Sequence, residues 1–299
     1  MFAALLQAIA SGVVTGCVYA LVALSLVIIY KSTDVINFAG GELVMIGGYL
    51  ALLGLVFFGM PYWAVFPAVA IVAGALGAGF DRLVVDRVLG RSVPGQSTLV
   101  ALVITTVGLS YVLKGAVRVV PYTEEVRRLP PVFTGEPVLI GSTILQQQDI
   151  AIVAIAVLFM VAWWLFFQYT MLGKALRATS ENPRAAALVG IPVRTMRMAI
   201  WAIAAAFAAV ARILLGPKLL MAPDMGVIVI LAFAAAIVGG FQNLLGCVVG
   251  GIVLGVVQNL VGLYISSQAI AVTPFVVIML VLVLRPQGLF GGVATTRRV

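Results

Sequence analysis

Residues 5–30 read LLQAIASGVVTGCVYALVALSLVIIY, a run without a charged residue that is longer than the roughly 20 apolar residues that cross a bilayer as a helix. The run also exceeds the apolar core of a secretory signal peptide, and no Lys or Arg precedes it. We therefore expect this segment to remain in the mature protein as a membrane-spanning helix.

The composition of the whole chain agrees with a membrane protein. Of its 299 residues, 63% are hydrophobic and 9% are charged, whereas an ordinary soluble domain is about 45–50% apolar and about 25% charged. So few charges could not cover the surface of a soluble fold of this length. The composition excludes a soluble enzyme, a disordered chain and a disulfide scaffold.

Eight further apolar runs follow the first, of which 43–59, 227–243 and 269–284 are marginal and fit broken or re-entrant segments as well as spans. The sequence thus predicts an all-α integral membrane protein, a polytopic helical bundle of about eight to nine transmembrane helices with broken or re-entrant segments. We expect one transmembrane domain over residues 1–299. The expected spans are 5–30, 43–59, 62–80, 97–119, 149–168, 197–216, 227–243, 246–264 and 269–284.

The basic residues predict the orientation, because cytoplasmic loops of membrane proteins are enriched in Lys and Arg. Twelve of the 18 Lys and Arg residues fall in one set of alternate segments and six in the other set. We expect the richer set, with the C-terminus, in the cytoplasm. The same bias explains the net charge of +8 without nucleic acid as a partner. The segments expected inside are 31–42, 81–96, 169–197, 240–246 and the C-terminal residues.

Two connecting segments are long enough to carry a function. Residues 121–148 are rich in Pro, Gly and polar residues and are expected on the extracytoplasmic side, as a loop or small hairpin that meets a partner or as a passive connector. Residues 169–197 are expected in the cytoplasm. Within them, Asn182, Pro183 and Gly190 have the types and spacing of a helix N-cap, a first helical residue and a left-handed residue that ends the helix. A helix of about two turns is marginal alone in water. It therefore packs either on a partner or on the chain's own spans.

Two polar breaks interrupt apolar sequence, and each precedes a glycine-rich run. Gly47 and Gly48 follow Phe38 by nine and ten residues, and Gly250 and Gly251 follow Phe241 at the same offsets. This equal spacing indicates an internal repeat or is a coincidence. Because backbone groups freed at membrane depth must line water or pack in protein, we place both breaks beside a translocation path. The candidate residues are Asn37, Phe38, Glu42, Gly239, Gly240, Gln242 and Asn243.

Glu42 is the carboxylate closest to the interior of a span. It either contacts a passing ammonium group or holds the break together through its oxygens, or it acts only as a favourable charge at a helix start. Lys114, Arg118 and Arg212 lie near the outer ends of spans, where we expect them to snorkel toward water. Small residues spaced four apart predict close helix packing; the pairs are Gly12 and Gly16, Gly246 and Gly250, and Gly251 and Gly255.

Several chemistries are missing from the sequence. The absence of histidine excludes imidazole catalysis and the HExxH zinc site, and the two cysteines, Cys17 and Cys247, cannot make a metal site alone. No phosphate-loop motif is present, so this chain does not hydrolyse ATP by that route. The spans also nearly lack the ionisable residues that couple secondary transport to ions. The sequence therefore predicts a transport pathway whose energy is supplied by another subunit.

Four segments, in order along nearly the whole chain, carry a family resemblance. Residues 173–193 (GKALRATSENPRAAALVGIPV) resemble the coupling-helix region of permease subunits of branched-chain amino acid ABC importers. The similarity extends over 11–49 with INFAGGE, 231–255 with VGG, and 284–291 with LRPQGLFG. The pattern is similar to the LivH-type permease rather than to its LivM-type partner.

The resemblance implies a subunit of the bacterial plasma (inner) membrane that works with a LivM-type permease chain, two ATP-binding subunits and an extracytoplasmic substrate-binding protein. The ATP-binding subunits would use ATP and Mg²⁺, and this chain would hold no cofactor. The residues implied in ATPase coupling are Arg177, Glu181, Asn182, Pro183, Arg184, Leu188 and Gly190. An importer of urea or short amides, a self-contained carrier or channel and, more remotely, a membrane enzyme are the alternatives.

Overall fold

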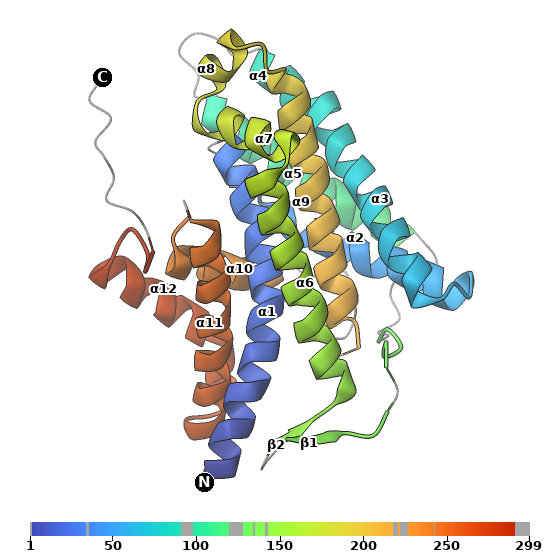
Figure 1. Cartoon of the computed structure of the whole chain (residues 1–299), viewed down its shortest axis with the longest axis vertical. Helices are drawn as coiled ribbons and strands as arrows, with labels where there is room; N and C mark the ends of the chain where they lie inside the picture. Colours follow the sequence, from blue (N-terminus) through green and yellow to red (C-terminus); the bar gives the residue numbers. More distant parts are fainter. Residues whose placement is uncertain are drawn as a thin grey trace. The chain divides into compact units, whose positions relative to one another are not determined.

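The residues described by a computed structural model of the chain are mainly helical (Figure 1). Among the residues that the structure describes, seven helices are long and apolar enough to cross a membrane, and two shorter apolar helices accompany them. The protein is an all-α polytopic membrane protein, as the sequence predicts. The described residues are 2–33, 36–90, 98–119, 128–133, 135–140, 143–217, 221, 227–241 and 243–290.

Each predicted apolar run corresponds to a helix, with shifted ends. The run 62–80 continues through a π-helical turn to Gly90, whereas the runs 227–243 and 269–284 form α-helices of only 13 and 12 residues. The elements in chain order are α1 (Phe2–Thr33), α2 (Gly40–Leu52), η1 (Leu53–Phe57), α3 (Tyr62–Phe80), η2 (Asp81–Val85), α4 (Asp86–Gly90), α5 (Thr98–Val119), β1 (Val138–Ile140), β2 (Thr143–Leu145), α6 (Gln147–Tyr169), α7 (Met171–Glu181), α8 (Pro183–Leu188), α9 (Val193–Leu215), α10 (Val227–Gly239), α11 (Leu244–Tyr264), η3 (Gln268–Ala271) and α12 (Thr273–Leu284).

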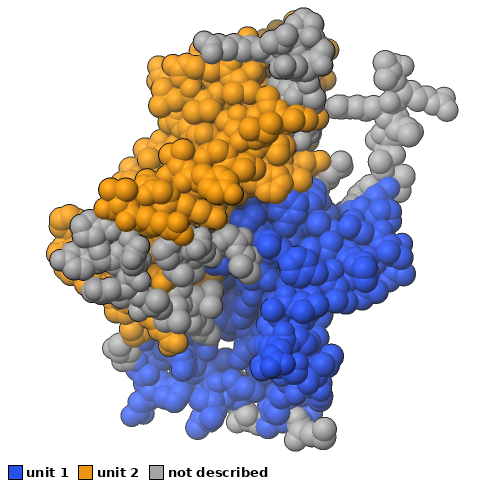
Figure 2. Space-filling view, turned by 180° about the vertical axis from the view of Figure 1, so that it is seen from behind, with its two compact units in different colours: residues 1–27, 133–156, 228–299 blue, residues 28–132, 157–227 orange. Residues whose placement is uncertain are grey.

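The chain divides into two compact units, which are coloured separately in Figure 2. Unit 1 holds residues 1–27, 133–156 and 228–299, and unit 2 holds residues 28–132 and 157–227. Helices α1 and α6 contribute residues to both units, because the boundaries fall after Val27 and after Ala156.

In unit 1, α1 and α11 cross at glycines. A Cβ added to Gly16 would lie 2.5 Å from Ile252 Cα, and one added to Gly251 would lie 2.6 Å from Ala20 N. Only glycine permits backbones to approach this closely. The expectation that these small residues serve helix packing is confirmed for α1 and α11.

Unit 1 also contains the described part of the predicted outer loop. Strands β1 and β2 pair antiparallel, with Leu139 opposite Ile144. The Gln7 side chain of α1 donates to the Ile144 carbonyl and accepts from the Ile144 N–H, both at 2.9 Å. The small hairpin considered for residues 121–148 is therefore present, and it is tied to the start of α1.

Unit 2 packs α2 and α3 against α9, and Figure 1 shows α3 running beside α9. Cβ atoms added to Gly47 and Gly77 would lie 2.3 Å from Ala209 Cα and 2.5 Å from the Trp201 carbonyl oxygen. An apolar core that includes Met45, Val69 and Ile213 fills the remaining space. These contacts fix the helices that carry the polar side chains described below.

Two pairs of connecting segments, each pair assigned to one side by the charge rule, meet at the two ends of α9 in unit 2. At one end, Arg197 at the start of α9 pairs with Asp81 at the end of α3, which joins the segments 81–96 and 169–197. Figure 1 shows α4, α7 and α8 at this same end. At the other end, Leu129 N donates to the Gly216 carbonyl at 3.2 Å, joining two segments assigned to the opposite side.

Candidate translocation and coupling sites

The first polar break lies between α1 and α2, in unit 2. Asn37 Oδ1 accepts from Ala39 N at 3.0 Å, and Phe38 N donates to Thr106 Oγ1 at 3.4 Å. Because Thr106 is in the middle of α5, the break lies at the depth of the middle of a span. Asn37 is buried, whereas Phe38 is 44% exposed.

A small cavity adjoins this break. Its volume is about 10 Å³, which is space for about one water molecule, and Asn37, Thr106 and Trp201 are among its lining residues. Asn37 Nδ2 and Trp201 Nε1 are buried and have no hydrogen-bond partner among the described residues. The break therefore presents buried hydrogen-bond donors inside an otherwise apolar unit.

Glu42 holds the break to α5. It lies in the first turn of α2, is buried, and its Oε1 is 3.4 Å from Lys114 Nζ. Its Oε2 is buried without a hydrogen-bond partner among the described residues. The ion pair matches the expectation that Glu42 holds the break together, and its place in the first turn also matches a charge at a helix start.

Two of the basic residues expected to snorkel do not do so. Lys114 turns to Glu42, and Arg212 is wholly buried near the end of α9. A Cβ added to Gly48 would lie 2.9 Å from Arg212 Cγ, so the guanidinium stem packs against α2. Sequence position near a span end suggested contact with water, but the close packing of α2 on α9 encloses this side chain.

The second polar break lies between α10 and α11, in unit 1. Gly240 has φ +97°, a conformation that favours glycine, and Asn243 Oδ1 accepts from Leu245 N at 3.1 Å and Gly246 N at 3.2 Å. A Cβ on Gly239 would lie 2.1 Å from the Gly246 carbonyl oxygen. The candidate Gln242 lies outside the described residues.

The C-terminal LRPQGLFG segment folds back onto this second break. Leu289 N donates to the Val238 carbonyl at 2.8 Å, and Phe290 N donates to the Gly239 carbonyl at 3.3 Å. Asn243 Nδ2 completes the contact by donating to the Phe290 carbonyl at 3.4 Å. Two motifs that are about 50 residues apart in sequence therefore form one structure, a relation that neither motif reveals alone.

Helix α8 has the caps that its sequence predicts. Asn182 Oδ1 accepts from Ala185 N at 3.0 Å, and Pro183 is the first helical residue. At the other end, Gly190 has φ +85°, Gly190 N donates to the Ala187 carbonyl, and Ile191 N donates to the Ala186 carbonyl. This is the Schellman arrangement, and it ends the helix after two turns.

The surface of α8 is unusually open. Ala186 is its one buried residue, whereas Arg184 is exposed and Leu188 is 90% exposed. The preceding α7 is half-buried through Leu176 and Thr179, and it ends at the exposed Glu181. Arg177, the other candidate residue on α7, donates from its Nη2 to Gln168 Oε1 at 3.1 Å.

An ion cluster joins the start of α9 to the end of α3. Arg197 Nε is 2.8 Å from Asp81 Oδ1, and Arg197 Nη2 is 2.8 Å from Asp86 Oδ1. Arg194 Nη2 is 2.5 Å from Asp86 Oδ2. These ion pairs link the first turns of α9 to the residues that directly follow α3.

The sequence alone places most of these charged residues in connecting segments and does not predict the ion cluster. Asp81, Arg82 and Asp86 end the apolar run, but the helix continues through the π-helical turn. Two spacings in the sequence could have indicated that these charges lie on helices. Arg82 and Asp86 are four residues apart, and Arg194 and Arg197 are three residues apart, so each pair fits one face of a helix.

Comparisons with known proteins identify the family. The model described as "Branched-chain amino acid transport system / permease component" matches residues 8–284. The high-affinity branched-chain amino acid transport system permease protein LivH of Escherichia coli (strain K12) is 32% identical over 296 residues, which cover 96% of this chain and 95% of LivH. BraD of Pseudomonas aeruginosa, with the same description, is 32% identical over 300 residues, with the same coverage.

A more distant relative widens the group. The ribose import permease protein RbsC of Haemophilus influenzae is 27% identical over 268 residues, which cover 84% of this chain and 78% of RbsC. The family match over most of the chain and the identity to LivH and BraD lead to one conclusion: this chain belongs to the branched-chain amino acid transport system permease family, as a multi-pass transporter subunit of the inner membrane.

Proposed function

We propose that this chain is the LivH-type permease subunit of an ATP-driven importer for branched-chain or similar hydrophobic amino acids. The names of LivH and BraD, each matched over 95% of its length, support this substrate class. The chain would form the translocation path together with a LivM-type permease, and an extracytoplasmic binding protein would deliver the substrate. Two ATP-binding subunits would use ATP and Mg²⁺ on the cytoplasmic side, where the C-terminus also lies.

The observation that carries the coupling proposal is the exposed, doubly capped helix α8. Isolated helices of two turns are marginal in water, so a cap at each end indicates that the helix is needed as a rigid body. Leu188 at 90% and Val189 at 76% exposure are apolar side chains in a connecting segment. An ATP-binding subunit that covered them would remove this apolar surface from water.

The path of force follows from the contacts around α8. Closure of the ATP-binding subunits would move α8, the segment through Pro192 would move the start of α9, and Arg197 would pull on Asp81 at the end of α3. Glu181, Asn182 and Arg184 belong to the part that receives the stroke. The two polar breaks, with Phe38 exposed at the first, would line the path and hold substrate weakly, since a pathway must release what it admits.

Cross-linking tests the docking of α8. The two native cysteines, Cys17 and Cys247, are buried, so a cysteine introduced as Leu188→Cys is the reactive one. We expect a short thiol-reactive cross-linker to join it to the ATP-binding subunit in the assembled complex. Leu172→Cys is the matched control, because Leu172 is also exposed but lies at the start of α7. Equal cross-linking at both positions, or none at position 188, would contradict the proposal.

A competition experiment tests the substrate class. Unlabelled leucine should suppress uptake of labelled leucine by the complete transporter, and urea at the same concentration should leave it unchanged. Uptake of labelled urea but not of labelled leucine would assign the chain to an importer of short amides instead.

A further inference from the structure

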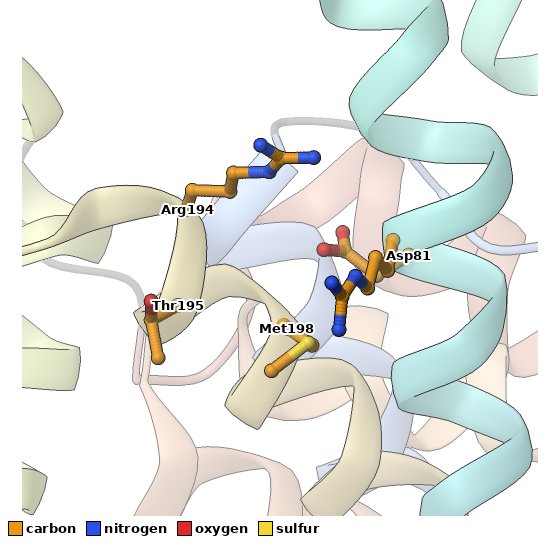
Figure 3. A pocket seen from close by; sticks show the side chains of 5 residues that line it. Asp81, Arg194, Thr195 and Met198 are labelled. Carbon is orange, nitrogen blue, oxygen red and sulfur yellow. The ribbon is translucent and has the colours of Figure 1, made fainter.

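A polar pocket lies in unit 2, between the end of α3 and the start of α9 (Figure 3). Its volume is about 270 Å³, and its walls are Asp81, Arg82, Arg194, Thr195 and Met198. In Figure 3, Asp81 and Arg194 point toward one another from opposite walls. The coupling proposal uses the ion cluster behind this pocket and leaves the pocket itself without a role.

The charges around the pocket are incompletely matched. Arg82 is exposed and makes no hydrogen bond or ion pair with another described residue. Asp81 is buried; its Oδ1 binds Arg197, but its Oδ2 has no hydrogen-bond partner in the described part of the chain. A ligand that completes this pocket therefore supplies an anionic group for Arg82 and a hydrogen-bond donor for Asp81 Oδ2.

The start of α9 adds further donors for an anion. Arg194 and Thr195 lie in its first turn, and the N-cap residue, Pro192, provides no side-chain cap. The N–H groups of a first turn have no intrahelical acceptor and favour a negative charge. The Thr195 side chain brings a hydroxyl to the same wall. These features place the anionic group of the ligand toward α9.

The location of the pocket selects a lipid. Asp81 belongs to the last third of the span Tyr62–Gly90, and Arg194 is the second residue of the span Val193–Leu215. The pocket is thus at the level of membrane headgroups. Below it, α3 presents exposed apolar side chains, including Ile71 and Leu76, that suit contact with acyl chains.

We propose that this pocket binds the headgroup of a phospholipid that carries a primary amine, such as phosphatidylethanolamine. The phosphate diester lies between Arg82 and Arg194, whose guanidinium groups match its oxygens. The ammonium group donates to Asp81 Oδ2. A basic side chain from an ATP-binding subunit would satisfy Asp81 but leave Arg82 without an anion, and free phosphate would do the reverse. A quaternary choline headgroup has no N–H to donate.

Native mass spectrometry of the detergent-purified transporter tests this site. After delipidation, phosphatidylethanolamine is added, and we expect it to be retained at least about fivefold more tightly than phosphatidylcholine with the same acyl chains. Arg82→Gln should weaken retention by about fivefold, the effect typical of one Arg near a membrane surface. Arg87→Gln is the matched control, because Arg87 is exposed on the same helical segment, donates to the Leu83 carbonyl and does not line the pocket.

Four results would overturn the proposal. They are equal retention of the ethanolamine and choline lipids, no effect of Arg82→Gln, full displacement of the lipid by inorganic phosphate at equal concentration, and retention of the lipid by the purified chain alone but not by the complete transporter. The third result would indicate a free anion site, and the fourth a contact between proteins. Because lipid retention is measured without transport, each result is independent of the proposed amino acid uptake.

Discussion

Replacing Arg197 with Met tests whether the ion cluster between α9 and α3 stabilises unit 2. The Arg197 guanidinium lies 2.8 Å from a carboxylate oxygen of Asp81, whose side chain is only 1% exposed. Removing it leaves a buried carboxylate without its counter-charge, which typically costs about 3–5 kcal/mol. Asp86, the other partner, is 19% exposed. Water can therefore solvate it, and it adds little to this cost.

Arg194→Met is the matched control for this prediction. The substitution is the same and the residue is one helical turn away, but the Arg194 side chain is 67% exposed. An ion pair this exposed contributes about 0–1 kcal/mol. We therefore expect the two variants to differ by at least about 2 kcal/mol in the free energy of unfolding. The assay is equilibrium unfolding of the purified chain in mixed detergent micelles.

A second substitution separates the charge effect from lost packing. Asp81→Asn in the Arg197→Met background removes the buried charge and keeps the shape of the side chain, so stability should recover by about 2 kcal/mol or more. Equal losses in Arg197→Met and Arg194→Met, or no recovery in the double variant, would refute the reasoning.

The other predictions concern helix packing, the cap of α8 and the first break. Gly16→Val places a Cβ 2.5 Å from Ile252 Cα and should lower the free energy of unfolding by at least about 1–3 kcal/mol; unchanged stability would disprove the close crossing. Asn182→Ala removes the N-cap of α8, which destabilises this helix by about 1 kcal/mol, and should reduce ATP-driven uptake while the free energy of unfolding of the chain falls by no more than about 1 kcal/mol; normal uptake would argue against a rigid coupling helix. Glu42→Gln removes the ion pair with Lys114, which is 27% exposed, so we expect a loss of about 1 kcal/mol or less together with slower uptake; uptake at the wild-type rate would exclude a role for Glu42 in the path.

Features set by nearby residues were predictable from the sequence. The spans follow from apolar runs long enough to cross a bilayer, and the ends of α8 follow from Asn182, Pro183 and Gly190, because capping acts within three or four residues. The close contact of Gly16 and Gly251 was also foreseen from the spacing of small residues, although the spacing did not say which helix each would meet.

Features set by distant residues were not predictable. Asp81 and Arg197 are separated by 116 positions, and a charge that ends an apolar run predicts a loop unless its partner is known. Arg212 was expected to reach water, yet α2 packs over it. The fold of the C-terminal segment onto Gly239 depends on backbone hydrogen bonds, and no side chain of either segment identifies the partner of these bonds.

In the proposed function, this chain is a transport pathway driven by ATP-binding subunits. Uptake of labelled leucine into proteoliposomes tests it directly, with the complete transporter and its binding protein compared with this chain alone. We expect accumulation against a concentration gradient only with the complete transporter and ATP. Accumulation by the chain alone, or accumulation driven by an ion gradient without ATP, would contradict the claim.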